Sequence, residues 1–345
     1  MPRSLILVSA LILIMFLVGC AKRNTAYNDE VLVTLDTIFP VVGNPLDLSF
    51  DANNIYVALD QGGISIINPT TSENRWYTKL ISRDGTTTNF MNIRKIAVVG
   101  EFNRLFLNEV GSTDLIHIVD ISEMDSLDIM DSITGDTHNI QDMKFLKILN
   151  PTGADVIELI YSSGRNVHYG RYNANLWMGS TFSFLSPVPA SGVDLNDTHI
   201  FVAGQQRGLF IYNRSNQQLI SEVVVPGQAL KVKVVGNYAY IASREGGLNI
   251  VNIANPAAPV RVGGFNTTGY ATSIDVSGDL AVVSSGSGSV YLFDISDPSN
   301  PVMKQRLIAA GYTNNAKFNG SKVIVASRDM GIMVYNLDAE RTTNY

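Results

Sequence analysis

The histidine side chains of this 345-residue chain could bind a metal or transfer a proton. There are four of them, His117, His138, His168 and His199. They lie far apart in the sequence, and none belongs to an HExxH motif or to a short-spaced cluster of the kind that zinc requires. We therefore interpret each histidine as structural and expect neither a metal nor a cofactor.

Other stretches contain reactive residue types without the rest of a motif. An acidic run from Glu123 to Asp131 lacks the closely alternating ligands and the glycine of a calcium loop, so it predicts a solvated outer strand. The segment Ser327-Arg-Asp-Met-Gly331 resembles part of the sialidase Asp-box but lacks the Thr-Trp that should follow. The sequence also contains no G-x-S-x-G elbow, P-loop or G-x-G-x-x-G element. These residues predict no catalytic centre.

The N-terminus has the pattern of a signal peptide. Met-Pro-Arg precedes an apolar run from Leu5 to Val18, which is shorter than the about 20 residues of a membrane span. The run ends at Gly19-Cys20, and small residues before a cysteine resemble the bacterial lipobox. The resemblance implies removal of residues 1–19, diacylglycerol on the Cys20 thiol, palmitate-type acylation of the new N-terminus, and a tether over residues 20–30. The alternatives are an ordinary signal peptide with a chance cysteine, or an uncleaved anchor.

Charge and cysteine content narrow the partners of the mature chain. The chain has 25 basic and 31 acidic residues; loss of Arg3 leaves 24 basic residues and a net charge of −7. Nucleic acid is therefore not an expected partner, because its binding requires clustered basic residues. Cys20 is the single cysteine, so the folded part can have no disulfide. Ala21, in place of an aspartate that would retain a lipoprotein in the inner membrane, favours the outer membrane.

Internal repeats predict the fold. Each unit contains a strand, a glycine-containing turn and a second strand that ends in Asp or Asn. These end residues lie 39 to 53 positions apart and are Asn68, Asp120, Asn173, Asn213, Asn252, Asp294 and Asn336. This is the length of a four-stranded propeller blade, so the chain is expected to be all-β, with a seven-bladed β-propeller of four-stranded antiparallel blades over residues 31–337.

The strands of blade five are predicted at 230–235, 238–243, 248–253 and 260–265, with a hairpin at Gly236-Asn237. Blade seven lacks a fourth strand, because only the polar tail 338–345 follows it. The apolar, β-branched segment 31–38 is therefore expected to close the ring as the outer strand of blade seven.

Three segments resemble a known repeat. They are Leu248-Asn-Ile-Val-Asn-Ile-Ala-Asn-Pro, Val290-Tyr-Leu-Phe-Asp-Ile-Ser-Asp-Pro and Ile116-His-Ile-Val-Asp-Ile-Ser. They are similar to the LVIVD repeat of surface-associated bacterial β-propellers. The resemblance is good in blades five to seven and poor in blade three. It implies a propeller on the cell surface and transfers no catalytic residue.

Each innermost strand is expected to present one residue to the central channel. In blade order these are Asp47, Ala97, Lys144, Asp194, Lys233, Asp275 and Lys317, with Lys95 on the same strand face as Ala97. Opposite charges then alternate between most neighbouring blades. We interpret this ring as ion pairs that join blades and neutralise the channel, rather than as a catalytic site.

The turns between second and third strands are the predicted binding face, because they combine glycine with charge. The residues assigned to this face are Asp60, Arg165, Arg207, Arg244, Glu245, Arg328 and Asp329, together with Phe90, Tyr270 and Tyr312 from loops entering inner strands. Arginine with tyrosine is typical of protein interfaces, and guanidinium groups also suit acidic glycans. The alternative is that the acidic residues merely pair with adjacent arginines in solvated turns.

Three functions are compatible with these observations. The favoured one is a non-enzymatic binding or scaffolding module, anchored to the membrane through lipid, for an envelope protein or glycan. The second is a propeller-type envelope hydrolase or lyase acting on a sugar or lactone, because such sites are assembled from scattered loops. The third is a structural subunit of an outer-membrane assembly.

Overall fold

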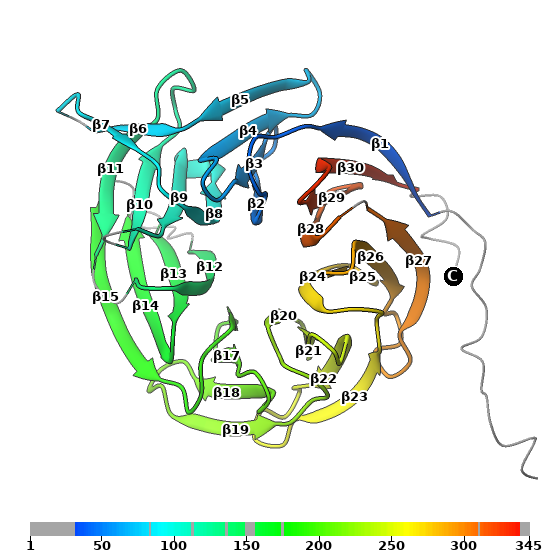
Figure 1. Cartoon of the computed structure of the whole chain (residues 1–345). Coiled ribbons are helices and arrows are strands. Elements are labelled where there is room, and N and C mark those ends of the chain that lie inside the picture. Colours follow the sequence, from blue (N-terminus) through cyan, green and yellow to red (C-terminus); the bar gives the residue numbers. More distant parts are fainter. Residues whose placement is uncertain are drawn as a thin grey trace, which may run out of the picture. The chain divides into compact units, whose positions relative to one another are not determined.

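The computed structural model describes residues 32–82, 84–111, 114–134, 137–148, 156–173, 176–309 and 311–338. These residues form seven β-sheets arranged as a ring around a central channel (Figure 1). Besides strands, they contain one short 3₁₀ helix, η1 (Gly100–Phe102). The predicted all-β, seven-bladed propeller is confirmed. The signal peptide, Cys20 and all but the first residue of the C-terminal tail lie outside the described residues.

Five blades are four-stranded meanders in which each strand pairs with the next along the chain. Blade one contains β2 (Asp47–Phe50), β3 (Ile55–Ala58), β4 (Ile64–Asn68) and β5 (Glu73–Tyr77). Blade three contains β12 (Ile140–Ile148), β13 (Val156–Ser163), β14 (Asn166–Asn173) and β15 (Leu176–Leu185). Blade four contains β16 (Gly192–Leu195), β17 (His199–Ala203), β18 (Leu209–Asn213) and β19 (Leu219–Val223). Blade five contains β20 (Lys231–Val235), β21 (Tyr238–Ala242), β22 (Leu248–Asn252) and β23 (Val260–Phe265). Blade six contains β24 (Ala271–Ser277), β25 (Leu280–Ser285), β26 (Ser289–Asp294) and β27 (Val302–Ile308).

Blade two is wider than the sequence repeat predicts. Its four strands are β8 (Ile93–Val99), β9 (Arg104–Glu109), β10 (Leu115–Asp120) and β11 (Asp128–Ile133). The hairpin of β6 (Lys79–Ser82) and β7 (Thr87–Asn89) extends this sheet to six strands, because β6 pairs parallel to β11. The additional residues between blades one and two thus cover a sheet edge that would otherwise present unpaired backbone groups.

Blade seven is closed by the N-terminal strand. It contains β28 (Thr313–Asn319), β29 (Lys322–Ser327) and β30 (Gly331–Leu337), and β1 (Val33–Phe39) pairs antiparallel to β30. Gln305 of blade six secures the start of β1: its Oε1 accepts hydrogen bonds from the N–H groups of Leu32 and Val33, and its Nε2 donates to the Val33 carbonyl. The predicted ring closure is confirmed.

Apolar side chains fill the spaces between neighbouring blades. In one buried cluster, Tyr240 and Ile250 of blade five lie with Ile274 and Val283 of blade six. The second and third strands are buried on both faces, which is why they appear in the sequence as continuous apolar runs. Each such side chain contributes about 1.5–3 kcal/mol when fully buried. No helix in the described ranges is long and apolar enough to cross a membrane.

Candidate functional site

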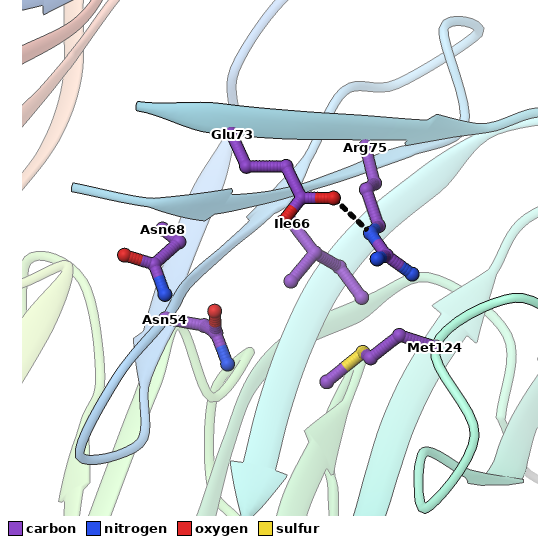
Figure 2. Close-up of a pocket in the computed structure, with 6 residues that line it drawn as sticks. All are labelled: Asn54, Ile66, Asn68, Glu73, Arg75 and Met124. Carbon is purple, nitrogen blue, oxygen red and sulfur yellow. Dashed lines mark hydrogen bonds and ion pairs between the residues drawn. The ribbon is translucent and has the colours of Figure 1, made fainter. Parts of the chain in front are cut away.

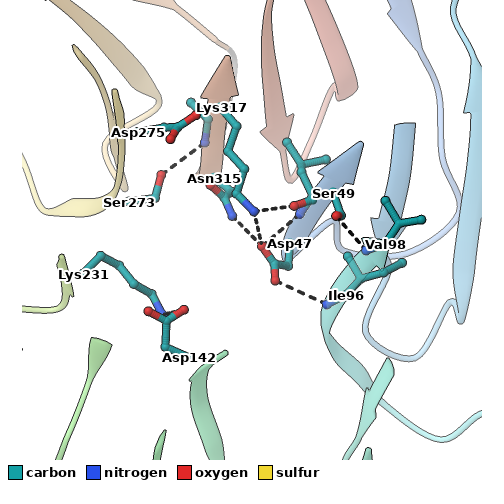
Figure 3. A network of polar contacts seen from close by, with 12 residues as sticks. Asp47, Ser49, Ile96, Val98, Asp142, Lys231, Ser273, Asp275, Asn315 and Lys317 are labelled. Carbon is teal, nitrogen blue, oxygen red and sulfur yellow. Dashed lines mark hydrogen bonds and ion pairs between the residues drawn. The ribbon is translucent and has the colours of Figure 1, made fainter. Parts of the chain in front are cut away.

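Asp47, at the start of inner strand β2, is the centre of a polar network in the channel (Figure 3). Its Oδ1 accepts hydrogen bonds from the Leu48 N–H at 3.0 Å, the Asn315 amide at 2.7 Å and the Lys317 ammonium at 3.2 Å. Its Oδ2 accepts one from the Ile96 N–H of blade two at 3.3 Å. Burial acts in the opposite direction, yet the charge of Lys317 and other channel lysines lowers the pKa of Asp47 to about 2. Asp47 therefore connects blades seven, one and two as a carboxylate.

Other channel aspartates connect an inner strand to the next blade. The Asp194 Oδ2 accepts a hydrogen bond from the Val234 N–H at 2.7 Å, and the Asp275 Oδ2 accepts one from the Phe318 N–H at 3.0 Å. An inner strand is a sheet edge, so its outward N–H groups need acceptors from outside the sheet. These carboxylates supply them.

A second layer of charge lies two residues nearer the start of the inner strands. The Lys231 ammonium is 2.9 Å from the Asp142 Oδ1 and donates to the Gln141 carbonyl at 2.6 Å. The contact joins blade five to blade three past blade four, where Gly192 holds the equivalent position. A Cβ on Gly192 would lie 2.6 Å from the Leu230 carbonyl oxygen, so a side chain there would clash. Of this layer the sequence singled out only Lys95, although the alternation of strand residues places Asp142 and Lys231 on the channel face as well.

The pKa values of two channel lysines, Lys231 and Lys144, are shifted in opposite directions. Burial, with the charges of Lys95 and Lys144, lowers the pKa of Lys231 to about 7 against the attraction of Asp142. For Lys144 burial is outweighed by the surrounding carboxylates, of which Asp142 is the strongest, and its pKa is raised. Burial also raises the pKa of Asp194.

The predicted ring of alternating charges is paired at two of its junctions. Lys317 lies 3.2 Å from Asp47, and Lys233 lies 3.6 Å from Asp275. Asp275 and Lys317 are also adjacent in this ring, but there the Asp275 carboxylate accepts a hydrogen bond from the Phe318 N–H of blade seven. The Lys144 ammonium makes neither a hydrogen bond nor an ion pair with any residue of the described ranges. The ring is therefore not a uniform circle of ion pairs.

The turns between second and third strands contact the loops that enter inner strands. Arg244 of blade five and Ala271 at the start of blade six exchange backbone hydrogen bonds of 3.2 and 3.0 Å. The Arg328 N–H donates at 2.8 Å to the carbonyl of Tyr312, in the loop that enters its own blade. The Arg244 guanidinium lies over the Tyr270 ring, 4.9 Å from its centroid. We call these turns and loops together the turn face. All ten residues assigned to the binding face by the sequence belong to it, namely Asp60, Phe90, Arg165, Arg207, Arg244, Glu245, Tyr270, Tyr312, Arg328 and Asp329.

The arginines of the turn face differ in their partners. Arg207 forms an ion pair with a carboxylate of outer strand β19, and Arg244 lies 3.8 Å from Glu245. Arg165 and Arg328 are exposed, and neither forms an ion pair with a residue that the structure describes. The Arg165 Nε donates to the Ser186 carbonyl at 2.9 Å, which leaves the other N–H groups of Arg165 for a carboxylate of a partner.

Exposed apolar side chains also lie on the same face, and of these the sequence predicted Tyr270 and Tyr312. They end or follow outer strands at intervals round the ring and are Val42, Met91, Leu185, Val224, Tyr270, Ile308 and Tyr312, with 37% to 77% of each exposed. Others, such as Val235 and Val260, lie at the opposite edge. Leu185 is paired with Asn166 directly after one turn, and Ile308 with Ser289 directly after another. A strand pattern does not show which apolar residue at a strand end remains exposed.

His117 lies in a chain of hydrogen bonds within blade two. Its Nε2 is 2.7 Å from the Glu109 Oε2, and its Nδ1 is 3.1 Å from the Ser132 Oγ. Serine, histidine and carboxylate in this order can form a nucleophilic triad. However, His117 is only 4% exposed, and the Ser132 N–H, a candidate oxyanion donor, is occupied by the Asp131 carboxylate at 2.8 Å. The chain of bonds joins three strands of the blade and gives substrate no access.

The other histidines have separate surroundings. His168 stacks on Tyr161 with ring centroids 4.8 Å apart, and His138 lies 3.1 Å from the Asp114 carboxylate. Burial lowers the pKa of His199. Among the residues described, no three histidine, cysteine or carboxylate side chains are grouped closely enough to hold a metal ion.

Two further hollows lie away from the channel. One of about 80 Å³ is lined by Asn54, Ile66, Asn68, Glu73, Arg75 and Met124 (Figure 2). Within it, Arg75 donates to Glu73 at 2.6 Å. The other, of about 560 Å³, contains the fully buried Glu158 carboxylate, which pairs with Arg171 at 3.1 Å and with Arg214. Glu73 and Glu158 are thus already bound by arginines.

Comparison with known proteins identifies the repeat and the fold. The LVIVD repeat matches residues 226–267 and 268–308, which are blades five and six with their entering loops. No curated protein matches the chain. Among solved structures, the computationally designed protein Ika8 is similar with a TM-score of 0.63 and 10% identity, over 87% of this chain and 98% of that one. The structure of U3-55K is similar with a TM-score of 0.66 and 13% identity, over 88% of this chain and 98% of that one. At such low identity these likenesses show the fold alone.

Proposed function

We propose that this protein is a non-enzymatic docking propeller of the bacterial envelope, whose turn face binds a protein segment rich in acidic and apolar residues. The observation that carries the proposal is that this face presents exposed apolar side chains beside exposed arginines. Clusters of exposed apolar side chains mark interaction sites, and arginine with tyrosine is enriched at protein interfaces.

Charge complementarity selects the partner. Arg165 and Arg328 have no carboxylate partner in the described ranges, so each can pair with one on another molecule. Aliphatic groups such as Leu185 and Ile308 favour a polypeptide over a glycan, because a glycan offers few apolar groups to cover them.

Site-specific photocrosslinking in the native envelope tests this function. A crosslinking residue replaces Ile308 on the turn face or, as the matched control, Val260, which is exposed at the start of outer strand β23 on the opposite edge. We expect one partner peptide, acidic and apolar, to be captured from position 308 alone. The triple variant Arg165→Ser, Arg244→Ser, Arg328→Ser should abolish this capture while thermal unfolding hardly changes. Equal capture from both positions, or capture that survives the triple variant, contradicts the proposal.

The envelope location rests on the lipobox resemblance of Leu17-Val-Gly-Cys20 and on Ala21. Two or three acyl chains on one N-terminus hold a protein on a bilayer stably, because each buried methylene contributes about 0.8 kcal/mol. The variant Cys20→Ser should leave the detergent phase or fail to mature, and the wild type should sediment with outer-membrane vesicles. A Cys20→Ser protein that remains in the detergent phase rules out lipidation.

A further inference from the structure

Two lysine side chains in the channel make no hydrogen bond or ion pair with the described residues. Lys95 of β8 and Lys144 of β12 line a cavity of about 210 Å³ at the end of the channel where the inner strands begin. Both side chains are partly buried, and within the described ranges neither makes a hydrogen bond or an ion pair. Each ammonium group therefore keeps hydrogen-bond donors that an anion from outside the chain can accept from.

The carboxylates of the same cavity are already engaged. Asp47 binds Lys317, Asn315 and backbone N–H groups, and Asp142 binds Lys231. The cavity wall contains four lysines and two aspartates, and Asp194 and Asp275 also act on Lys144, whose pKa the surrounding carboxylates raise. Of the four lysines, Lys95 and Lys144 make no ion pair within the described ranges.

The rest of the wall indicates the kind of anion. Asp47 and Asp142 would repel a second negative charge, which favours a single carboxylate over phosphate. Ser49, Ser273 and Asn315 add hydroxyl and amide groups to the wall, which suit the hydroxyl groups of a ligand. The volume is below the about 300–1,000 Å³ of pockets for drug-sized molecules, so it fits a ligand of monosaccharide size.

We propose that this cavity binds the carboxylate of a small hydroxylated acid, such as a uronic acid, through Lys95 and Lys144. The two lysines come from adjacent blades, two and three, so the bound carboxylate bridges the inner strands β8 and β12. The site is separate from the turn-face residues, so its test is independent of protein docking.

Isothermal titration calorimetry of the mature chain with D-glucuronate tests the site, with D-glucose as the neutral analogue and inorganic phosphate as the competing anion. We expect one glucuronate per chain, no heat from glucose and weaker binding of phosphate. Lys95→Met and Lys144→Met should each weaken glucuronate binding about 10- to 100-fold, equivalent to about 1.4–2.8 kcal/mol. The matched control Lys79→Met, at an exposed position on β6, should bind like the wild type.

Thermal unfolding shows whether the variants remain folded. Without ligand, Lys144→Met should lower the Tm, because the surrounding carboxylates favour the charge of Lys144, whereas in both variants the rise of Tm with glucuronate should disappear. The proposal is overturned if the folded wild type does not bind glucuronate, if glucose or phosphate binds as well or better, or if both variants bind like the wild type.

Discussion

The channel and the turn face both combine basic and acidic side chains, yet they place them in different environments. In the channel, Asp47 is 11% exposed and Asp142 9% exposed, and each is held by a lysine and by backbone N–H groups. On the turn face, the Arg244 side chain is 37% exposed and its partner Glu245 is 51% exposed. Removing one partner of a buried ion pair destabilises the fold, because the other charge stays buried. An exposed ion pair contributes only about 0–1 kcal/mol to stability. The channel charges therefore hold the ring together, and the turn-face charges are free to serve binding.

The largest effect is expected from Asp47→Asn. The change removes the charge that Lys317 needs and places an amide against the Asn315 amide. Breaking a buried pair in this way costs about 3–5 kcal/mol. Urea unfolding at neutral pH should show a loss of this size. A loss of unfolding free energy below about 1 kcal/mol would mean that this channel pair contributes no more than an exposed pair. The contrast between the channel and the turn face would then be wrong.

Two double-mutant cycles sharpen the contrast within the channel. The Lys317 and Asp47 pair, at 3.2 Å with further hydrogen bonds, should show a coupling energy of about 1–3 kcal/mol in the cycle Lys317→Met, Asp47→Leu. The longer and more exposed Lys233 and Asp275 pair, at 3.6 Å, should couple by less than about 1 kcal/mol in the cycle Lys233→Met, Asp275→Leu. Additive effects in both cycles would show that the channel pairs do not join blades.

A pH dependence distinguishes Lys231 from the turn-face arginines. Its pKa in the folded state is lowered from 10.5 to about 7, with Asp142, Lys144, Lys95 and Asp47 as the charged groups around it. Below pH 7 both folded and unfolded states hold the proton, and burial of that charge destabilises the fold. Between pH 7 and 10.5 the unfolded state holds more protons, so this group makes stability rise with pH, by at most about 1.4 kcal/mol per pH unit.

The measurement is the free energy of unfolding from pH 6 to pH 9 for the wild type and for Lys231→Met. Subtracting the variant removes the other titrating groups, and the difference should grow in favour of the wild type as pH rises. A difference that is flat across this range would show that Lys231 keeps an ordinary pKa. A similar comparison with Arg328→Ser should show no slope, because a guanidinium stays charged throughout.

The smallest effects are expected on the turn face itself. Arg244 stacks on Tyr270 and donates to the Gln228 side chain at 2.7 Å, so Arg244→Ser should cost about 0.5–1 kcal/mol. Arg328 has no such side-chain contacts among the described residues, and Arg328→Ser should change stability by less than about 0.5 kcal/mol. Thermal unfolding of both variants checks the order. A large loss for Arg328→Ser would mean that this arginine is structural.

The repeats determined most of the architecture. A propeller blade recurs at a nearly fixed length, and its buried strands are continuous apolar runs, so the seven blades could be counted from Asn68 to Asn336. The closing strand followed from the same count, because blade seven was one strand short. The alternation of side chains along a strand also placed Asp47, Lys233 and Lys317 in the channel.

The tertiary structure decided which of these residues meet. Alternation assigns a side chain to a face of a strand but does not state how far it reaches, so the contact of Lys231 with Asp142 past Gly192 required the ring itself. The same holds for Lys95 and Lys144, whose side chains differ from those of the paired lysines in making no hydrogen bond or ion pair within the described ranges. A residue's type and strand position are local properties of the sequence. Its partner depends on the distance between blades, which is set by the packing of all seven sheets around the channel.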